Sequence, residues 1–301
     1  MPGIYVEIDI HSSMEDLWAR TQSPDLHQQW DLRFTEIQYL ARPDLTQPQR
    51  FLYKTRIGFG LNIAGEGESV GTHENNGSRT SALKFWSDDS KSLIKVGSGY
   101  WQYIPLSDRI RFLTWYDYTT CFGLVGRFMD ASVFRPLLGW ATAWSFDRLR
   151  LWIEKGRDPA ISLRQAAIYG ICRTMVAFVW IYHGLVPKLL FEHHDESAML
   201  LAGGIPAEQL TTALTVLGLA EIGLRGAMMI AWRARALFGA TIVLMVVALL
   251  TVALQSPGYL VAAFNPVSLN MAMIALSVIG LLTGKDLPSA ARCRRTRVET
   301  A

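Results

Sequence analysis

Hydrophobic and polar positions divide the chain into two halves with different patterns. Up to about residue 155, apolar and polar residues alternate in short runs that clusters of Gly, Asn, Asp and Pro separate. From Ile168 to Leu282, the apolar residues form four long runs with almost no polar stripe. Short alternating runs are typical of strands, and apolar runs of about 20 residues are typical of membrane-spanning helices. The pattern therefore predicts a soluble α+β module joined to a small membrane bundle.

The first half begins with residues 4–10, in which every second residue is isoleucine or valine, and this alternation predicts a strand with one buried face. Ser12 and Glu15 have the spacing of a capping box, so we expect a helix to begin there. After a second short helix, several strand-like stretches follow, separated by turn signals. A long helical segment from about Val125 to Lys155 ends this half, and Pro136 within it should bend or break the helix.

Four apolar segments of the second half are long enough to cross a membrane. A helix needs about 20 residues for this, and the fourth segment is the shortest. Asn265 before Pro266 is typical of an N-cap followed by proline in the first turn, which predicts the start of the fourth helix. Four such runs in succession disfavour the alternative of buried helices in a soluble protein. The predicted spans cover about residues 168–190, 210–232, 236–254 and 266–283.

Basic residues in the connecting segments predict the orientation of these spans. Four spans place both ends of the chain on one side, and the opposite loops are acidic or uncharged, with Lys188 alone near that face. No basic segment followed by an apolar one, as in a signal peptide, opens the chain. We therefore predict a multi-pass protein of the cell (inner) membrane with cytoplasmic N- and C-termini. The basic residues of the predicted cytoplasmic side are Arg157, Arg164, Arg233, Arg235, Lys285, Arg292, Arg294, Arg295 and Arg297.

Ionisable residues in the first two spans are candidates for an intramembrane polar site: Arg173 and His183 in the first span, and Glu221 and Arg225 in the second. A charge within the hydrocarbon is costly, so it usually marks a functional site or a paired structural bridge. Residues i and i+4 share a helix face, so antiparallel neighbours would place Glu221 between the guanidiniums of Arg173 and Arg225. A bridge that only holds the spans together is the alternative. For His183, the alternative is an interfacial hydrogen bond to a threonine.

The segment RTMVAFVWIYHGLVPKLLFEHHDESAML, residues 173–200, resembles the first span and the following loop of the DoxX-like membrane proteins. The resemblance covers about residues 165–284 and implies four short spans. Some DoxX-like proteins are linked to quinone-coupled redox chemistry, which raises a quinone as a cofactor, although these spans contain no cysteine pair or haem-ligand pattern. The residues that carry the resemblance are Trp180, Gly184, Leu185, Val186, Pro187, Lys188, His194, Glu196, Met199 and Glu221.

The element order of the first half resembles the SRPBCC or START-like fold: a strand, paired short helices, antiparallel strands and a long final helix. The resemblance covers about residues 4–155 and also rests on the opening IYVEIDIHSSMEDLWARTQSPDLHQQWD. It implies a helix-grip fold, in which a curved sheet wraps a long helix and leaves an apolar cavity between them. Members of that family bind lipids, sterols, polyketides or other apolar molecules, and a minority catalyse cyclisation or hydrolysis.

Aromatic residues dominate the strands that would line such a cavity, and an aromatic cleft with few polar groups suits an apolar ligand. Filling of the core is the alternative for each of these residues. The alternation leaves open whether the set with Tyr100 or the set with Trp101 faces inward. The candidate ligand-binding residues are Tyr53, Trp86, Trp101, Tyr103 and Trp115, among further aromatics that include Phe59, Phe85, Tyr100, Tyr116 and Tyr118.

Composition and charge narrow the chemistry further. The net charge of +3 comes with scattered basic residues that lack interleaved aromatics, a pattern that disfavours nucleic-acid binding. The three cysteines lie far apart and give neither a disulfide framework nor metal-ligand spacing. The run EHHDE at 192–196 contains metal-ligand types, but such runs are usually solvated loops, so we predict no metal site. Candidate acids and bases of the first half have no obvious partner and should lie at the surface: Asp31, Glu36, Glu66, Glu68 and His73.

These patterns predict an α+β helix-grip (START-like) domain followed by an all-α four-helix transmembrane bundle. The leading hypothesis is a cytoplasmic domain that binds a lipid, isoprenoid or polyketide-like molecule at the bilayer surface. The alternatives are a quinone-linked redox subunit with proton-handling residues in the bundle, or a non-catalytic scaffold for a membrane protein partner. No reaction is predicted. The predicted parts are the START-like domain at 1–155, a linker at 156–165, the DoxX-like domain at 166–284 and a basic cytoplasmic tail at 285–301.

Overall fold

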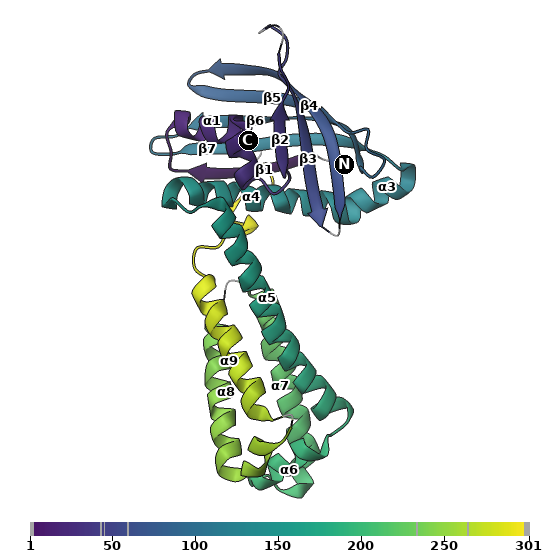
Figure 1. Cartoon of the computed structure of the whole chain (residues 1–301), viewed down its shortest axis with the longest axis vertical. Helices are drawn as coiled ribbons and strands as arrows, with labels where there is room; N and C mark the ends of the chain where they lie inside the picture. The colour runs from purple at the N-terminus through teal and green to yellow at the C-terminus, as the bar shows by residue number, and fades with distance from the viewer. Residues whose placement is uncertain are drawn as a thin grey trace. The chain divides into compact units, whose positions relative to one another are not determined.

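The computed structural model describes residues 3–42, 44, 46–58, 60–232, 234–263 and 265–297. The chain forms two compact units (Figure 1): a helix-grip unit, Met1–Ser162 with Leu287–Ala301, and a helical unit, Leu163–Asp286. Phe59 and Arg233, which the sequence patterns singled out, lie outside the described residues. A seven-stranded sheet dominates the first unit and helices form the second, so the predicted α+β domain followed by an all-helical bundle is confirmed.

The sheet of the helix-grip unit is antiparallel, with the order β1-β7-β6-β5-β4-β3-β2. The first and last strands pair at one edge, and α1 (Met14–Gln22) and α2 (Pro24–Trp30) connect β1 to β2 at the opposite edge. A register shift between Ser69 and Gly71 of β4 marks an irregularity of the kind that helps a sheet to curve. The strands are β1 (Ile4–Ile10), β2 (Glu36–Tyr39), β3 (Arg50–Gly58), β4 (Leu61–Asn75), β5 (Ser78–Trp86), β6 (Ile94–Pro105) and β7 (Ile110–Thr120).

The two short helices follow local signals in the sequence. Ser13 caps α1, because its side-chain oxygen accepts a hydrogen bond from the backbone N–H of Asp16 at 3.1 Å. The expected capping box of Ser12 and Glu15 is therefore wrong by one residue. The second helix, α2, begins with Pro24, a position where a missing backbone N–H costs nothing.

The predicted long final helix is divided into three segments. Pro136 lies in the first turn of the third segment, so the irregular turn precedes the proline. The buried side of this third segment packs on the sheet, where Phe146 stacks on Phe112 of β7 with ring centroids 4.4 Å apart. It runs along the sheet (Figure 1) as the helix of a helix-grip fold does. The segments are α3 (Gly123–Met129), the π-helical η1 (Asp130–Phe134) and α4 (Arg135–Lys155).

The last described residues complete the helix-grip unit. Asp147 of α4 is fully buried, and its carboxylate accepts hydrogen bonds from the backbone N–H of Ser289 at 2.8 Å and from Nη1 of Arg292 at 2.9 Å. Arg294 exchanges two backbone hydrogen bonds with Glu7 of β1, and its guanidinium donates to the Glu7 carboxylate at 2.8 Å. The parts of the chain before and after the helical unit therefore belong to one folded unit.

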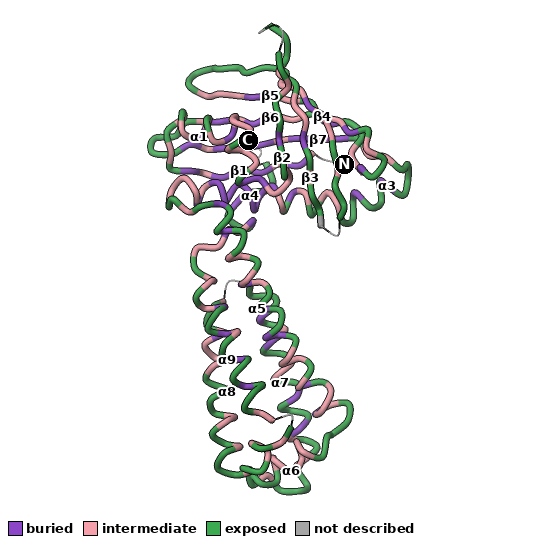
Figure 2. The backbone as a smooth tube through the Cα atoms, in the orientation of Figure 1, coloured by how far each residue is buried: buried purple, intermediate pink, exposed green. Residues whose placement is uncertain are grey.

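Among the described residues, four helices are long and apolar enough to cross a membrane, as predicted. The fourth begins at Pro266, and Asn265 caps it by accepting a hydrogen bond from the N–H of Ser268. Many residues of these helices are exposed (Figure 2), and large apolar side chains are common among them, as a lipid environment requires. The elements are α5 (Pro159–Gly184), the π-helical η2 (Leu185–Leu190), α6 (His194–Ala202), η3 (Ala207–Gln209), α7 (Leu210–Ile230), α8 (Ala236–Gln255), η4 (Pro257–Val261) and α9 (Pro266–Thr283), with η5 (Ala290–Arg292) in the tail.

Loss of the Arg292 contact should loosen the helix-grip unit. In Arg292→Ala, Asp147 keeps the donor of Arg150 but loses a charge-assisted hydrogen bond, and we expect the free energy of unfolding of this unit to fall by about 1 kcal/mol. Hydrogen–deuterium exchange of the α4 amides, with the full chain in lipid nanodiscs, measures this change. Arg295→Ala, at an exposed position of the same tail, is the control. Equal exchange in the two variants would show that the tail does not support α4.

Candidate functional site

A cavity of about 550 Å³ lies in the helix-grip unit between the sheet and the first half of α4. This volume is within the range of small-molecule sites, about 300–1,000 Å³. Its walls come from the strands β2 to β7, from α1, α2 and the segment that follows them, and from Leu137, Leu138 and Ala141 of α4. The wall surface is mainly apolar. The aromatic residues of the lining include Phe34, Phe51, Tyr53, Phe85, Trp101, Tyr116, Phe134 and Trp140.

The five predicted ligand-binding residues lie in different surroundings. Tyr53 and Trp101 line the cavity, whereas Trp86, Tyr103 and Trp115 are outside its described lining. Tyr103 is fully buried beside the cavity. Trp86, on β5, is half-buried. The structure therefore brings two of the five residues to one cavity wall.

The strand β6 presents Trp101 and Tyr103 to the interior, which answers the question that the alternation left open. The hydroxyl of Tyr103 lies 2.6 Å from Oγ1 of Thr21 and accepts a hydrogen bond from the side-chain amide of Gln22 at 2.9 Å. Tyr100 is also a residue of the cavity lining, but it is only half-buried and its ring stacks on Trp115 with ring centroids 6.1 Å apart. The inward set is therefore the one that contains Trp101.

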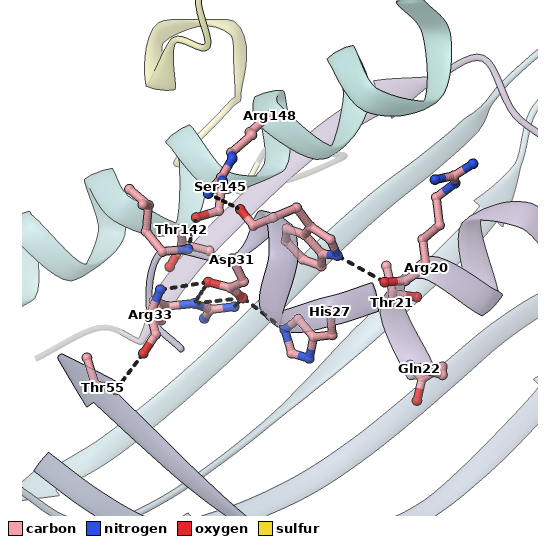
Figure 3. Close-up of polar contacts among 12 residues, drawn as sticks. Arg20, Thr21, Gln22, His27, Asp31, Arg33, Thr55, Thr142, Ser145 and Arg148 are labelled. Carbon is pink, nitrogen blue, oxygen red and sulfur yellow. Dashed lines mark hydrogen bonds and ion pairs between the residues drawn. The ribbon is translucent and has the colours of Figure 1, made fainter. Parts of the chain in front are cut away.

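A buried polar cluster of His27, Asp31 and Arg33 adjoins the cavity (Figure 3), and His27 and Arg33 are part of its lining. Asp31 is 1% exposed and follows the last residue of α2. Its Oδ1 accepts from Nε of Arg33 at 2.9 Å, and its Oδ2 accepts from Nη2 of Arg33 at 2.6 Å. His27 lies one helical turn earlier, and its Nε2 is 3.0 Å from Oδ2 of Asp31.

Contacts from α4 and from the sheet hold this cluster in position. The backbone N–H of Leu32 donates to Oγ of Ser145 on α4 at 2.9 Å. On the other side, the hydroxyl of Thr55 on β3 donates to the carbonyl of Arg33 at 2.5 Å. The segment that carries Asp31 is therefore fixed between the helix and the sheet (Figure 3).

The charges of the cluster follow from burial and from these pairs. Burial alone would raise the pKa of the Asp31 carboxyl, but the charge of Arg33 and the hydrogen bonds from His27 and Arg33 outweigh it and hold that pKa well below its usual range. Burial lowers the pKa of His27, and the hydrogen bond and charge of Asp31 offset this only in part. At neutral pH the cluster therefore contains an ionised Asp31, a charged Arg33 and a neutral His27.

The expected surface position of Asp31 is wrong, and His27 and Arg33 are residues that the sequence pattern did not single out. The local signal was the i,i+4 spacing of His27 and Asp31 on a short helix, but this spacing does not show that both side chains are buried. Their burial depends on α4 and β3, which are distant in the sequence. Among the other candidate acids and bases, Glu36 and His73 are exposed, as predicted.

In the helical unit, Arg173 closes the end of a neighbouring helix. It is fully buried, and its guanidinium donates to the carbonyl of Met228 at 2.6 Å, to the carbonyl of Ala231, and to the hydroxyl of Tyr169 at 2.7 Å. Met228 and Ala231 lie at the C-terminal end of α7, where carbonyls have no partner within the helix and favour a positive charge. These contacts favour the structural-bridge interpretation for Arg173.

The carboxylate of Glu221 lies 3.3 Å from Nζ of Lys188, which also lies 3.2 Å from the carboxylate of Glu196. The expected position of Glu221 between Arg173 and Arg225 is therefore wrong. Lys188 is buried because it belongs to η2, the π-helical end of the first span. Hydropathy alone does not predict that the chain turns this lysine into the bundle.

Arg225 is fully buried, with its guanidinium 4.4 Å from the centroid of the Trp180 ring and Nη1 donating to Oγ1 of Thr241 at 2.7 Å. Within the described residues, Nε and Nη2 of Arg225 and Nε1 of Trp180 are buried without a hydrogen-bond partner. Unpaired buried donors are costly, so they suit an acceptor from outside the chain. His183, the fourth candidate, offers its backbone carbonyl to Lys188 at 3.3 Å.

A model of the DoxX-like family matches residues 177–278. The chain is also 50% identical over 184 residues to the "Uncharacterized membrane protein YndG" of Bacillus subtilis (strain 168), a match that covers 60% of this chain and 68% of YndG. The chain belongs to the YndG family. It is therefore a membrane protein, and its second half is a DoxX-like domain, as the sequence patterns predicted.

Some solved structures resemble about half of this YndG-family protein. The STAR-related lipid transfer protein from Xanthomonas axonopodis is 14% identical, with a TM-score of 0.39 over 50% of this chain and 84% of that chain. The di-domain ARO/CYC StfQ of the steffimycin biosynthetic pathway is 11% identical, with a TM-score of 0.36 over 50% of this chain and 52% of that chain. The helix-grip class of the YndG-family protein rests on its own strand order and on the packing of α4 against the sheet.

Removal of the Asp31 charge should destabilise the helix-grip unit. Asp31→Asn leaves Arg33 buried without its carboxylate, and we expect the free energy of unfolding to fall by about 3 kcal/mol. Denaturant titration followed by near-ultraviolet circular dichroism of the full chain measures this loss. The control is Asp25→Asn, at an exposed position of the preceding helix α2, which should change the free energy by less than about 0.5 kcal/mol. An equal fall in the free energy of unfolding in both variants would show that the buried Asp31–Arg33 ion pair does not stabilise this unit.

Acid should weaken the wild type more steeply than Asp31→Asn. Because the pKa of Asp31 is lowered by folding, its contribution to stability is fully present above the unfolded-state pKa of about 3.9 and is lost as the pH falls through the folded-state value. Stability measured from pH 6 downward should therefore fall below about pH 4 in the wild type, with a smaller slope in the variant. If stability falls with the same slope in the wild type and in Asp31→Asn, Asp31 is not the cause of the pH dependence.

Proposed function

We propose that the helix-grip unit binds an apolar small molecule, of the lipid, isoprenoid or polyketide-like class, at the surface of the membrane that anchors the DoxX-like domain. The observation that supports this most is the cavity of about 550 Å³, whose wall is mainly apolar and aromatic. Sites for small molecules combine such a wall with a few polar groups that orient the ligand. Here His27 is a polar group of that kind, and Arg33 is a further polar residue of the lining.

A face of exposed apolar side chains near the cavity supports the location at the bilayer. Leu124 is 82% exposed and Phe128 is 70% exposed, and large apolar patches of this kind usually mark contact with another apolar phase. Leu137 and Trp140 belong both to this face and to the cavity lining, so the ligand would exchange with lipid across it. The face consists of Phe122, Leu124, Val125, Phe128, Met129, Val133, Leu137 and Trp140.

Filling the cavity should abolish ligand retention. In Ala141→Trp, the new indole would occupy space in the cavity lining, and we expect the bound apolar species to disappear. The test is solvent extraction and mass spectrometry of full-length protein that is taken from native membranes directly into lipid nanodiscs. Ala131→Trp is the size-matched control, because Ala131 is exposed on η1 and lies outside the described lining. An identical lipid profile in the wild type and both variants would refute the proposal.

A quinone site in the helical unit is the second candidate, and the unpaired donors of Arg225 and Trp180 favour it. A quinone carbonyl oxygen is an acceptor, which a guanidinium N–H and an indole N–H can bind together. Glu221, one helical turn from Arg225, would then be close enough to exchange a proton with the bound group. The non-catalytic scaffold is the alternative, in which these donors only stabilise the bundle.

Loss of the Arg225 guanidinium should weaken quinone binding. We expect Arg225→Leu to raise the Kd of decylubiquinone about tenfold or more, because a charged donor is lost from a buried site. Isothermal titration of nanodisc-embedded protein, with empty nanodiscs as the blank, gives the affinity. Arg235→Leu, at an exposed position, should leave it unchanged, and Arg225→Lys should restore part of it. Equal affinity in the wild type and Arg225→Leu would contradict a quinone site at Arg225 and favour the non-catalytic scaffold.

A further inference from the structure

The ring of His27 is held in one orientation at the cavity wall. The ring stacks on Trp30 with centroids 5.0 Å apart, and it meets Phe34 and Trp101 edge to face with centroids 5.2 Å and 4.8 Å away. Its Nε2 is committed to Asp31 at 3.0 Å. Figure 3 shows the second ring nitrogen directed away from Asp31. Because His27 lines the cavity, Nδ1 is the ring atom that is left for a ligand.

The partner of Nε2 decides which ring nitrogen carries the proton. An ionised carboxylate has no proton to donate, and Arg33 holds Asp31 in its ionised form through two guanidinium hydrogen bonds. The Nε2 atom of the neutral ring must therefore be the donor, and Nδ1 keeps its lone pair. The same arrangement, an imidazole oriented by a buried carboxylate, makes the free nitrogen a good proton acceptor.

The surroundings of this acceptor restrict the ligand further. Phe34 and Trp101 contact the ring of His27 and also line the cavity, as does Tyr53, which lies 5.6 Å from Phe34 between ring centroids. Aromatic side chains favour flat aromatic groups through offset and edge-to-face contacts. An acceptor atom among aromatic rings therefore suits a flat molecule that carries a hydrogen-bond donor.

We propose that Nδ1 of His27 accepts a hydrogen bond from the ligand, and that the ligand is an apolar aromatic molecule with a phenolic or enolic hydroxyl group. This inference rests on the proposed function, since it names the substrate class of the same cavity. Arg33 and Asp31 act as positioning residues, because they fix the tautomer and the orientation of His27 without contacting the hydroxyl.

A pair of probes that differ only in the donor tests the inference: 2-naphthol and 2-methoxynaphthalene. Full-length protein in nanodiscs should bind 2-naphthol about tenfold more tightly, because the ether leaves the buried acceptor without a partner. In His27→Phe, which keeps an aromatic ring, this preference should disappear. Empty nanodiscs correct for partition into lipid, and Ala141→Trp should abolish the binding of both probes.

Nitrogen-15 NMR of histidine-labelled wild-type protein gives a readout that a purely structural histidine would not change. The Nδ1 resonance of His27 should move when 2-naphthol is added and stay in place with 2-methoxynaphthalene. This experiment tests the role of His27 in the wild-type protein. The variant His27→Phe serves here only to assign the resonance.

The outcomes separate the two proposals. If neither probe binds in the cavity, the proposed function itself loses its support. If both probes bind with equal affinity and Nδ1 does not respond to 2-naphthol, the cavity binds apolar molecules but the role of His27 is overturned. A preference for 2-naphthol that persists in His27→Phe would assign the recognition to another polar group of the lining.

Discussion

The organisation of the chain into two units depends on the hydrogen bonds of one buried carboxylate, that of Asp147. It is held by Arg150 of its own helix and by Ser289 and Arg292, which come from the far end of the chain. A buried carboxylate is costly unless it is paired, so the packing of α4 and the docking of the tail support each other. The DoxX-like domain is therefore inserted between two parts of one fold. The chain leaves the helix-grip unit, forms the helical unit, and returns to the helix-grip unit.

The same turn of α4 that holds the tail also positions the candidate site. Ser145 accepts the N–H of Leu32, and Arg148 donates to the carbonyl of Trp30 at 3.3 Å, so both fix the chain on either side of Asp31. The first half of α4 lines the cavity, while its second half binds the tail. The helix α4 therefore contacts the end of the chain, the polar cluster and the cavity. A displacement of α4 would alter all three.

Local sequence patterns predicted the elements of this fold because the relevant physics is local. Alternation in residues 4–10 reflects a strand with one buried face, and the Asn265–Pro266 pair reflects the free N–H groups of a helix start. The long apolar runs predicted the spans because a single segment can satisfy its own backbone hydrogen bonds in lipid only as a helix. The resemblances to the START-like and DoxX-like families followed from the order of these elements and from a short motif around Pro187.

The candidate site was harder to predict because its residues acquire their environment from distant parts of the chain. Asp31 looks like a surface residue until β3 and α4 bury it, and Lys188 looks like a loop residue until η2 turns it toward Glu221. Likewise, the basic residues near the C-terminus indicate orientation, but not that Arg292 and Arg294 complete the helix-grip unit. Composition and spacing record which groups are available, whereas tertiary packing decides which of them meet.

The central claim is that the cavity of the helix-grip unit holds an apolar ligand, and an experimental structure of the protein purified from its native membrane without detergent tests it most directly. The account predicts continuous density inside the cavity, against Tyr53 and Trp101, with one polar atom within hydrogen-bond distance of Nδ1 of His27. A cavity that is closed, with those aromatic side chains packed against α4, would contradict it.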